Sequence, residues 1–234
     1  MSQRQRLWQR LTEAGIAPAS HQALLDAGRL QPNTLKLSHW VQAETQLWLD
    51  GEPLPPVPPR CYWAYHKPVG IDCNVRPDDP QSIASVLQQL PPGVFAVGRL
   101  DKDSCGLLLI TNDGQFAQRL LHPTQQHQKT YRVDVDQTVT EAMLAELRTG
   151  MRYQAGPAWI EARPCLATLS AAYQLELTLT EGKNRQIRYM CKQLGLKVIR
   201  LQRTHIGQLY LPELSVGQLL ELQPQQVILA AQQP

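Results

Sequence analysis

The segment from residue 53 to residue 59 most constrains how this chain of 234 residues can fold. It reads Pro-Leu-Pro-Pro-Val-Pro-Pro, and so many prolines exclude a helix or an inner strand and favour an extended, semi-rigid spacer. We therefore expect a small module over residues 1–52, a proline-rich linker over 53–59 and a main domain over 60–234. The length of the chain suits such a division into one small and one medium domain.

The pattern of the small module predicts two helices and a strand. The first helix is expected around residues 7–14, where Gly15 stops it, and the second over about 19–27, where Gly28 stops it. Residues 47–49 read as a strand that enters a turn. The module is therefore expected to be a small α/β unit.

The main domain mixes strands and helices without the regular alternation of a doubly wound fold. Apolar and polar residues alternate over 131–136 and 174–179, which predicts two half-buried strands, and the apolar run 106–111 predicts a strand buried on both faces. A helix is predicted over 140–149, with Gly150 as its stop. These elements indicate an α+β domain built on a mainly antiparallel, mixed sheet.

Composition excludes several classes of protein. The longest purely aliphatic run, residues 107–110, is far shorter than the roughly 20 residues of a membrane-spanning helix. No apolar segment follows the charged start, so no secretory signal is predicted. The five cysteines form no C-x-x-C pair and the six histidines are scattered, so we expect neither a disulfide framework nor a metal site. Because no disulfides are expected, we also expect a cytoplasmic location.

Positive charge is concentrated late in the main domain. The chain has a net charge of +3, and residues 1–59 contain five basic and five acidic side chains, so the excess lies entirely in 60–234. No Asp or Glu occurs from 182 to 212, whereas seven Lys and Arg residues fall within 183–203. A polyanion is the natural partner of such a local field, and a solvated helix face is the alternative.

The centre of this basic stretch has helical spacing. On a predicted helix over 183–195, Arg185, Arg188 and Lys192 are spaced i, i+3 and i+7 and share one face, and Gly195 stands at the C-terminal cap. Ile187 lies on the other, apolar face, which is expected to pack in the core.

A polar loop between two apolar stretches contains two carboxylates. Asp101 and Asp103 lie there between Gly98 and Gly106, and such loops between rigid strands often bear functional groups. Taken alone, Asp101 is more often a turn or capping residue than a catalytic one. The chain contains no glycine-rich phosphate loop, H-E-x-x-H or G-x-S-x-G motif.

These two segments together resemble the signatures of pseudouridine synthases of the RsuA type. Residues 98–114 resemble the family's G-R-L-D-x-x-S/T-x-G-L-L signature, and residues 181–188 resemble its E-G-R/K-N-R-Q-I/V-R motif. The wording of both is most similar to the RluF branch. Three further motifs follow the family's order: 66–70 (N-K-P-x-G, with His66 in place of Asn), 129–133 (K-x-Y-x-V) and 201–207 (L-x-R-x-x-I-G).

The small module resembles the S4 RNA-binding domain that precedes the catalytic domain in most of these enzymes. Its order of helix, glycine, helix and glycine is similar, but residues 18–21 stand where a basic helix start is usual. A module without net charge should bind phosphate weakly. RNA binding and a packing role are therefore equal alternatives for residues 1–52.

The resemblance implies an enzyme of the pseudouridine synthase fold that isomerises a specific uridine of ribosomal RNA to pseudouridine. It implies neither metal nor cofactor, a base that is flipped into a pocket, and a monomer without membrane association. The large-subunit RNA is the expected substrate. The alternatives are transfer RNA, small-subunit ribosomal RNA, and RNA binding without chemistry.

The resemblance also implies roles for individual residues. Asp101 is expected to be the essential carboxylate, as nucleophile or as base, with Arg188 as its cationic partner and Ile187 packed behind that ion pair. Tyr131 is expected to stack on the flipped base. A set of basic side chains is expected to hold the RNA backbone: Arg99, Lys183, Arg185, Lys192 and Arg200.

Overall fold

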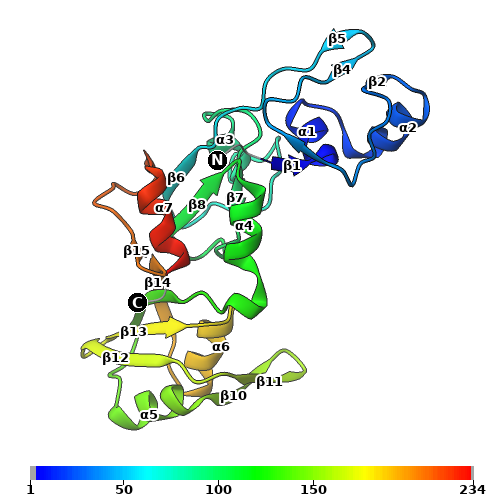
Figure 1. The fold of residues 1–234 in the computed structure, drawn as a ribbon. Coiled ribbons are helices and arrows are strands. Elements are labelled where there is room, and N and C mark those ends of the chain that lie inside the picture. The colour runs from blue at the N-terminus through cyan, green and yellow to red at the C-terminus, as the bar shows by residue number, and fades with distance from the viewer. Residues whose placement is uncertain (1–3, 233–234) are drawn as a thin grey trace. The chain divides into compact units, whose positions relative to one another are not determined.

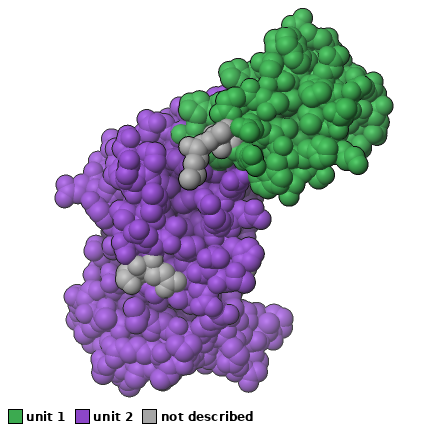
Figure 2. Space-filling view, in the orientation of Figure 1, with its two compact units in different colours: residues 1–60 green, residues 61–234 purple. Residues whose placement is uncertain are grey.

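The computed structural model of this chain describes residues 4–232 and divides it into two compact units, Met1–Arg60 and Cys61–Pro234 (Figure 2). The first three residues of the expected small module and the last two of the expected main domain therefore lie outside the described residues. Among those that are described, no helix is long and apolar enough to cross a membrane.

The N-terminal unit is a small α/β module with its own apolar core. Helices α1 (Leu7–Glu13) and α2 (His21–Asp26) lie in the predicted segments ahead of Gly15 and Gly28. The core is formed by residues such as Leu7, Leu11 and Leu47. Its short strands are β1 (Arg4–Arg6) paired with β3 (Trp40–Gln42), and β2 (Leu30–Gln31), β4 (Trp48–Leu49) and β5 (Glu52–Pro53) in a second sheet.

The N-terminal module extends further into the proline-rich segment than the composition predicted. Pro53 already lies in strand β5, and Leu54 is buried in the core of the module, where its amide donates a hydrogen bond to the carbonyl of Leu47 at 2.8 Å. Proline is tolerated at the edge of a sheet because its missing N–H faces no partner there. The start of the expected 53–59 linker therefore belongs to the module.

The second unit is built around a mixed sheet of nine strands in the order β12-β13-β9-β14-β8-β6-β16, with β15 on β14 and β7 on β8 (Figure 1). The neighbouring strands are antiparallel except β14 and β8, which run parallel. The predicted α+β fold with a mainly antiparallel, mixed sheet is thereby confirmed. The strands are β6 (Tyr62–Lys67), β7 (Phe95–Val97), β8 (Cys105–Thr111), β9 (Lys129–Val135), β12 (Leu166–Ala171), β13 (Gln174–Leu179), β14 (Val198–Ile206), β15 (Leu209–Tyr210) and β16 (Leu219–Glu221).

Strand β8 lies at the centre of one half of this sheet, and all seven of its residues are buried. Leu107 and Leu109 pack into a cluster with helices α4 (Gly114–Leu121) and α7 (Pro224–Ala231). Leu108 and Ile110 point to the opposite face, where α3 (Ala84–Leu87) packs. This two-sided burial explains the continuous apolar run from which the strand was predicted.

The other half of the sheet, β12, β13 and β9, has a separate core. Helix α5 (Glu141–Thr149) occupies the predicted segment, because the Thr140 hydroxyl caps its start and Gly150, with φ of 85°, ends it. Apolar residues of β9 and β13 pack against α5 and against helix α6 (Gln186–Gln193). A hairpin of β10 (Met151–Ala155) and β11 (Ala158–Ala162) adds to this core.

Candidate functional site

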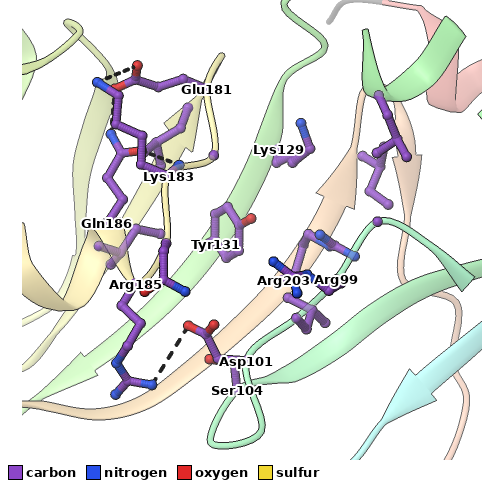
Figure 3. A pocket seen from close by; sticks show the side chains of 18 of the residues that line it. Arg99, Asp101, Ser104, Lys129, Tyr131, Glu181, Lys183, Arg185, Gln186 and Arg203 are labelled. Atoms are coloured by element: carbon purple, nitrogen blue, oxygen red, sulfur yellow. Dashed lines mark hydrogen bonds and ion pairs between the residues drawn. The ribbon is translucent and has the colours of Figure 1, made fainter. Parts of the chain in front are cut away.

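A cavity of about 690 Å³ lies beside the central strands of the second unit (Figure 3). Asp101 reaches it from the loop between β7 and β8, Tyr131 from β9, and Arg185 from the segment ahead of α6. Three motifs that are far apart in the sequence are therefore brought to one cavity. Strand pairing explains this meeting, because β9 and β8 both flank β14.

A buried lysine holds the loop that presents Asp101. Lys67, at the end of β6, is fully buried, and its ammonium donates hydrogen bonds to the carbonyl oxygens of Pro68, Asp101 and Ser104 at 3.0, 3.1 and 2.8 Å. Burial lowers the pKa of Lys67, and the three carbonyl dipoles take the place of water around its charge. The sequence motif that contains Lys67 gave no indication of this role.

Asp101 and Asp103 are linked through one arginine. Nη1 of Arg185 lies 4.0 Å from Oδ2 of Asp101, and the guanidinium donates to both carboxylate oxygens of Asp103 at 3.1 and 2.7 Å. Burial alone would raise the pKa of Asp103, but the hydrogen bond from Arg185 and the charges of Arg188 and Arg185 outweigh it and hold this pKa below its usual value. The hydrogen bond to Asp103 is also the main cause of a raised pKa of Arg185.

The expected ion pair between Arg188 and Asp101 is not the one in the described structure. Arg188 donates to the carbonyl oxygen of Asp103 at 2.7 Å and to the Ser104 hydroxyl at 3.4 Å, and its Nε lies 3.3 Å from the Asp103 carboxylate. Its side chain, 14% exposed, does not line the cavity. Arg188 therefore holds the loop, whereas Arg185 is the cation beside Asp101.

Arg185, and not Arg188, lies beside Asp101 because helix α6 begins later than predicted. The motif was predicted to be helical from Lys183, but the helix spans Gln186–Gln193. Arg185 adopts a left-handed backbone conformation, with φ of 52°, and the Gln186 side chain accepts a hydrogen bond from the amide of Lys183. This turn moves Arg185 off the helical face that it was expected to share with Arg188.

Tyr131 and Ile187 both line the cavity. Tyr131 is half-buried and contacts the apolar clusters on both sides of the cavity, and its register partner on β14 is Arg203. Ile187 is 5% exposed and packs in the core beneath α6. The cavity thus offers an aromatic ring and an aliphatic side chain close to the paired charges.

The basic residues expected to contact RNA lie in three places. Lys192 lies with Arg188 beside a smaller cavity of about 430 Å³, and Arg200 is exposed on β14 outside the lining of both cavities. Lys183 lies 3.1 Å from Glu181, so its charge is already paired. Three members of the set line the main cavity: Arg99, Lys183 and Arg185.

Other lining residues were given no role from the sequence, namely His127, Lys129 and Arg203, although Lys129 and Arg203 stand in two of the quoted motifs. Burial and, secondarily, the charge of Arg203 lower the pKa of Lys129 to about 8. The signal that could have found Lys129 is its position two residues before Tyr131, because residues i and i+2 of a strand point to the same face. Its burial, in contrast, depends on neighbouring strands that the sequence does not reveal.

No group of three or more His, Cys, Asp or Glu side chains in the described part of the chain could hold a metal ion. The expectation that the reaction needs neither metal nor cofactor stays a prediction.

Comparison with known proteins places this site in a family context. The sequence model of a family described as RNA pseudouridylate synthase matches residues 61–193. Ribosomal large subunit pseudouridine synthase B of Bacillus subtilis (strain 168) is 31% identical over 95% of this chain and 94% of its own length. The protein of the same name from Escherichia coli (strain K12) is 38% identical over 64% of this chain, which spans only 52% of that relative.

A solved structure described as a crystal structure of pseudouridylate synthase also resembles this chain. It has a TM-score of 0.68 and 25% sequence identity over 96% of this chain and 99% of its own. Both named relatives carry the designation B, so the expected similarity to the RluF branch is wrong. Two short motifs were too little sequence to tell one branch from another.

Proposed function

Because the chain belongs to the RNA pseudouridylate synthase family, we propose that it isomerises a uridine of large-subunit ribosomal RNA to pseudouridine at the cavity that Asp101 lines. The chain is an RNA pseudouridine synthase, an isomerase. The large-subunit substrate is supported by the names of the relatives, because both are ribosomal large subunit pseudouridine synthases B. The observation that carries the site is the convergence of Asp101, Tyr131 and Arg185 on one cavity.

The reaction detaches uracil from its ribose, rotates it and rejoins it through carbon. A target base inside folded RNA must first be turned out of its stack, and the cavity of about 690 Å³ has room for a nucleoside. Tyr131 offers its ring as the surface on which the flipped base stacks. Stacking of a base on an aromatic side chain offsets part of the cost of unstacking it from the RNA.

Asp101 acts at the glycosidic carbon, as nucleophile or as base, and either role requires the ionised carboxylate. Arg185 places a positive charge 4.0 Å from this carboxylate. Arg188 and Lys67 act on the loop, since both donate hydrogen bonds to its backbone carbonyl oxygens. They are positioning residues, and they fix the direction in which the Asp101 side chain leaves the chain.

The N-terminal module and the remaining basic residues concern the RNA rather than the reacting base. We propose that the module is of the S4 type, and that the exposed charges of Lys192 and Arg200 contact phosphates without reading sequence.

Mapping of pseudouridines in all stable RNAs of a strain that lacks the gene tests the proposal. The expected result is the loss of pseudouridine at one position of the large-subunit RNA, restored by the intact gene and not by the Asp101→Asn variant. A loss confined to transfer RNA or to the small subunit would overturn the substrate assignment. Unchanged pseudouridine at every position would contradict the proposed reaction and favour RNA binding without chemistry.

A further inference from the structure

One part of the cavity lining contains positive charges for which the proposed chemistry has no use. Lys129 on β9, Arg203 on β14 and Arg99 in the loop after β7 all line the cavity (Figure 3), and within the described residues none of them forms an ion pair with a carboxylate. The acidic residues of the lining are each occupied by another cation: Asp72 by Arg76 at 3.1 Å, Asp101 by Arg185 at 4.0 Å and Glu181 by Lys183 at 3.1 Å.

Two of the groups in this part of the lining are buried with open hydrogen-bonding positions. Arg203 is 3% exposed, and its Nε donates to the carbonyl of Leu107 at 2.8 Å, but its Nη2 is buried without a hydrogen-bond partner. His127 is 9% exposed, and its buried Nδ1 is likewise without a partner. The ammonium of Lys129 donates to the carbonyl oxygen of His127 at 3.2 Å, which links these two residues.

The groups in this part of the lining also feel one another's charge. Burial and then the charge of Arg203 lower the pKa of Lys129 to about 8, and burial and then the charge of Lys129 lower the pKa of His127. The titratable groups that line the cavity around Lys129 are Arg203 on β14, Tyr131 on β9, and His127 and Arg99 in the adjoining loops. The carboxylates of the neighbouring strands, Asp134 on β9 and Glu176 on β13, lie outside the lining of the cavity.

We propose that Arg99, His127, Lys129 and Arg203 form a phosphate subsite, which binds the phosphodiester next to the flipped uridine. Buried cations without a counter-charge are costly, and a phosphate oxygen would accept from the open Nη2 of Arg203 and from the Lys129 ammonium together. A uracil carbonyl is neutral, so it would accept hydrogen bonds here but leave the positive charge uncompensated. The subsite rests on the proposed function, because it names the part of the RNA that accompanies the base into the cavity.

Anion binding at this place should be coupled to a proton. At pH 8 about half of the Lys129 side chains are neutral when the cavity is free, because the pH then equals their pKa. A bound phosphate anion raises that pKa, so up to about half a proton is taken up per phosphate bound. His127, with its pKa lowered from 6.5, is neutral at this pH and contributes little.

Calorimetric titration of the intact protein at pH 8, in two buffers of different ionisation enthalpy, measures both quantities. The probes are uridine, uridine 5′-monophosphate and uridine 3′-monophosphate, which offer the phosphate on either side of the ribose. We expect one nucleotide to bind at least about tenfold more tightly than uridine, with uptake of up to about half a proton. Equal affinity for all three probes would overturn the subsite, and a preference without proton uptake would overturn the coupling of phosphate binding to Lys129.

Variants assign the effect to Lys129. Lys129→Gln is expected to lose both the preference and the proton uptake, whereas Lys129→Arg, which stays charged, should keep the preference and lose only the uptake. Lys197→Gln is the matched control, because Lys197 is exposed and lies outside the lining of the main cavity. A preference that persists in Lys129→Gln would refute the assignment, and thermal unfolding shows that each variant is folded.

These measurements do not depend on turnover. If the protein prefers a nucleotide over uridine but makes no pseudouridine, the subsite is supported and the proposed function is refuted. An active enzyme that binds uridine as tightly as both nucleotides would refute the subsite and leave the proposed function intact.

Discussion

Asp101 keeps 30% of its side chain exposed, although its backbone is fixed from beneath by Lys67. This geometry leaves the carboxylate free to approach a substrate. In Asp101→Asn the amide keeps the size but can act neither as nucleophile nor as base, so pseudouridine formation should fall by more than about a thousandfold. Single-turnover assays with excess enzyme measure this rate, and binding of the RNA should survive. A residual rate within about tenfold of the parent would contradict the role of Asp101.

The two arginines near this carboxylate should have separable effects. Arg185→Gln removes the cation 4.0 Å from Asp101 and should lower the rate of the bound complex by about tenfold or more. Arg188→Gln removes the donor to the Asp103 carbonyl oxygen and should lower the free energy of unfolding by about 2 kcal/mol. Single-turnover rates at saturating enzyme and urea denaturation separate the two. The assignment is wrong if Arg188→Gln has the larger effect on the rate and none on stability.

At this scale, motif and spacing located the groups better than they assigned the contacts. Asp101 and Tyr131 stand in short, ordered motifs, and both line the cavity. The position of Arg185 beside Asp101 depends on its left-handed backbone conformation. A projection that assumes helical geometry at every residue cannot predict this conformation. Lys129 was missed because its pKa reflects burial by strands that are distant in the sequence.

At the scale of elements, the loop between β7 and β8 depends on strand β6. Lys67→Met keeps the length of the side chain but leaves the carbonyl oxygens of Asp101 and Ser104 without their donor. We expect a loss of about 3 kcal/mol in the free energy of unfolding and a lower single-turnover rate. Lys102→Met, in the same loop but exposed, is the control and should leave stability nearly unchanged. Equal stability of the two variants would show that Lys67 does not hold the loop.

The contact between β8 and β14 depends on one glycine. Gly106 has φ of 107°, and a Cβ atom there would lie 2.3 Å from the carbonyl oxygen of Arg203. Gly106→Ala should therefore cost at least about 2 kcal/mol, because the strands must separate and the backbone is strained. Gly114→Ala, at the first residue of α4 with open space around it, is the matched control. Chemical denaturation of both proteins checks this, and equal midpoints would contradict the close approach.

The elements that the sequence predicted best are those with a clear period or a clear stop. Strand β8 and helix α5 have both, and each was found within a residue of its observed bounds. The start of α6 was wrong because the side chain of Gln186, and not a typical capping residue, closes the preceding turn. Pro53 was assigned to the linker because composition cannot show that Leu54 is buried in the module.

At the scale of the molecule, the charge of the N-terminal module limits its part in RNA binding. Residues 1–59 have no net charge, so the module should neutralise few phosphates. Deletion of residues 1–60 is expected to change the slope of log affinity against log salt by less than about one unit. Filter binding at several salt concentrations measures the slope, with the full chain as the reference. A decrease of two units or more would make the module a principal RNA contact.

The two halves of the large sheet meet in a parallel pairing of only two residue pairs, Gln202 with Cys105 and Arg203 with Gly106. Each half has its own core, and the cavity draws Asp101 from one half and Arg185 from the other. The 4.0 Å separation of these two side chains therefore depends on how the two halves are oriented across this short junction.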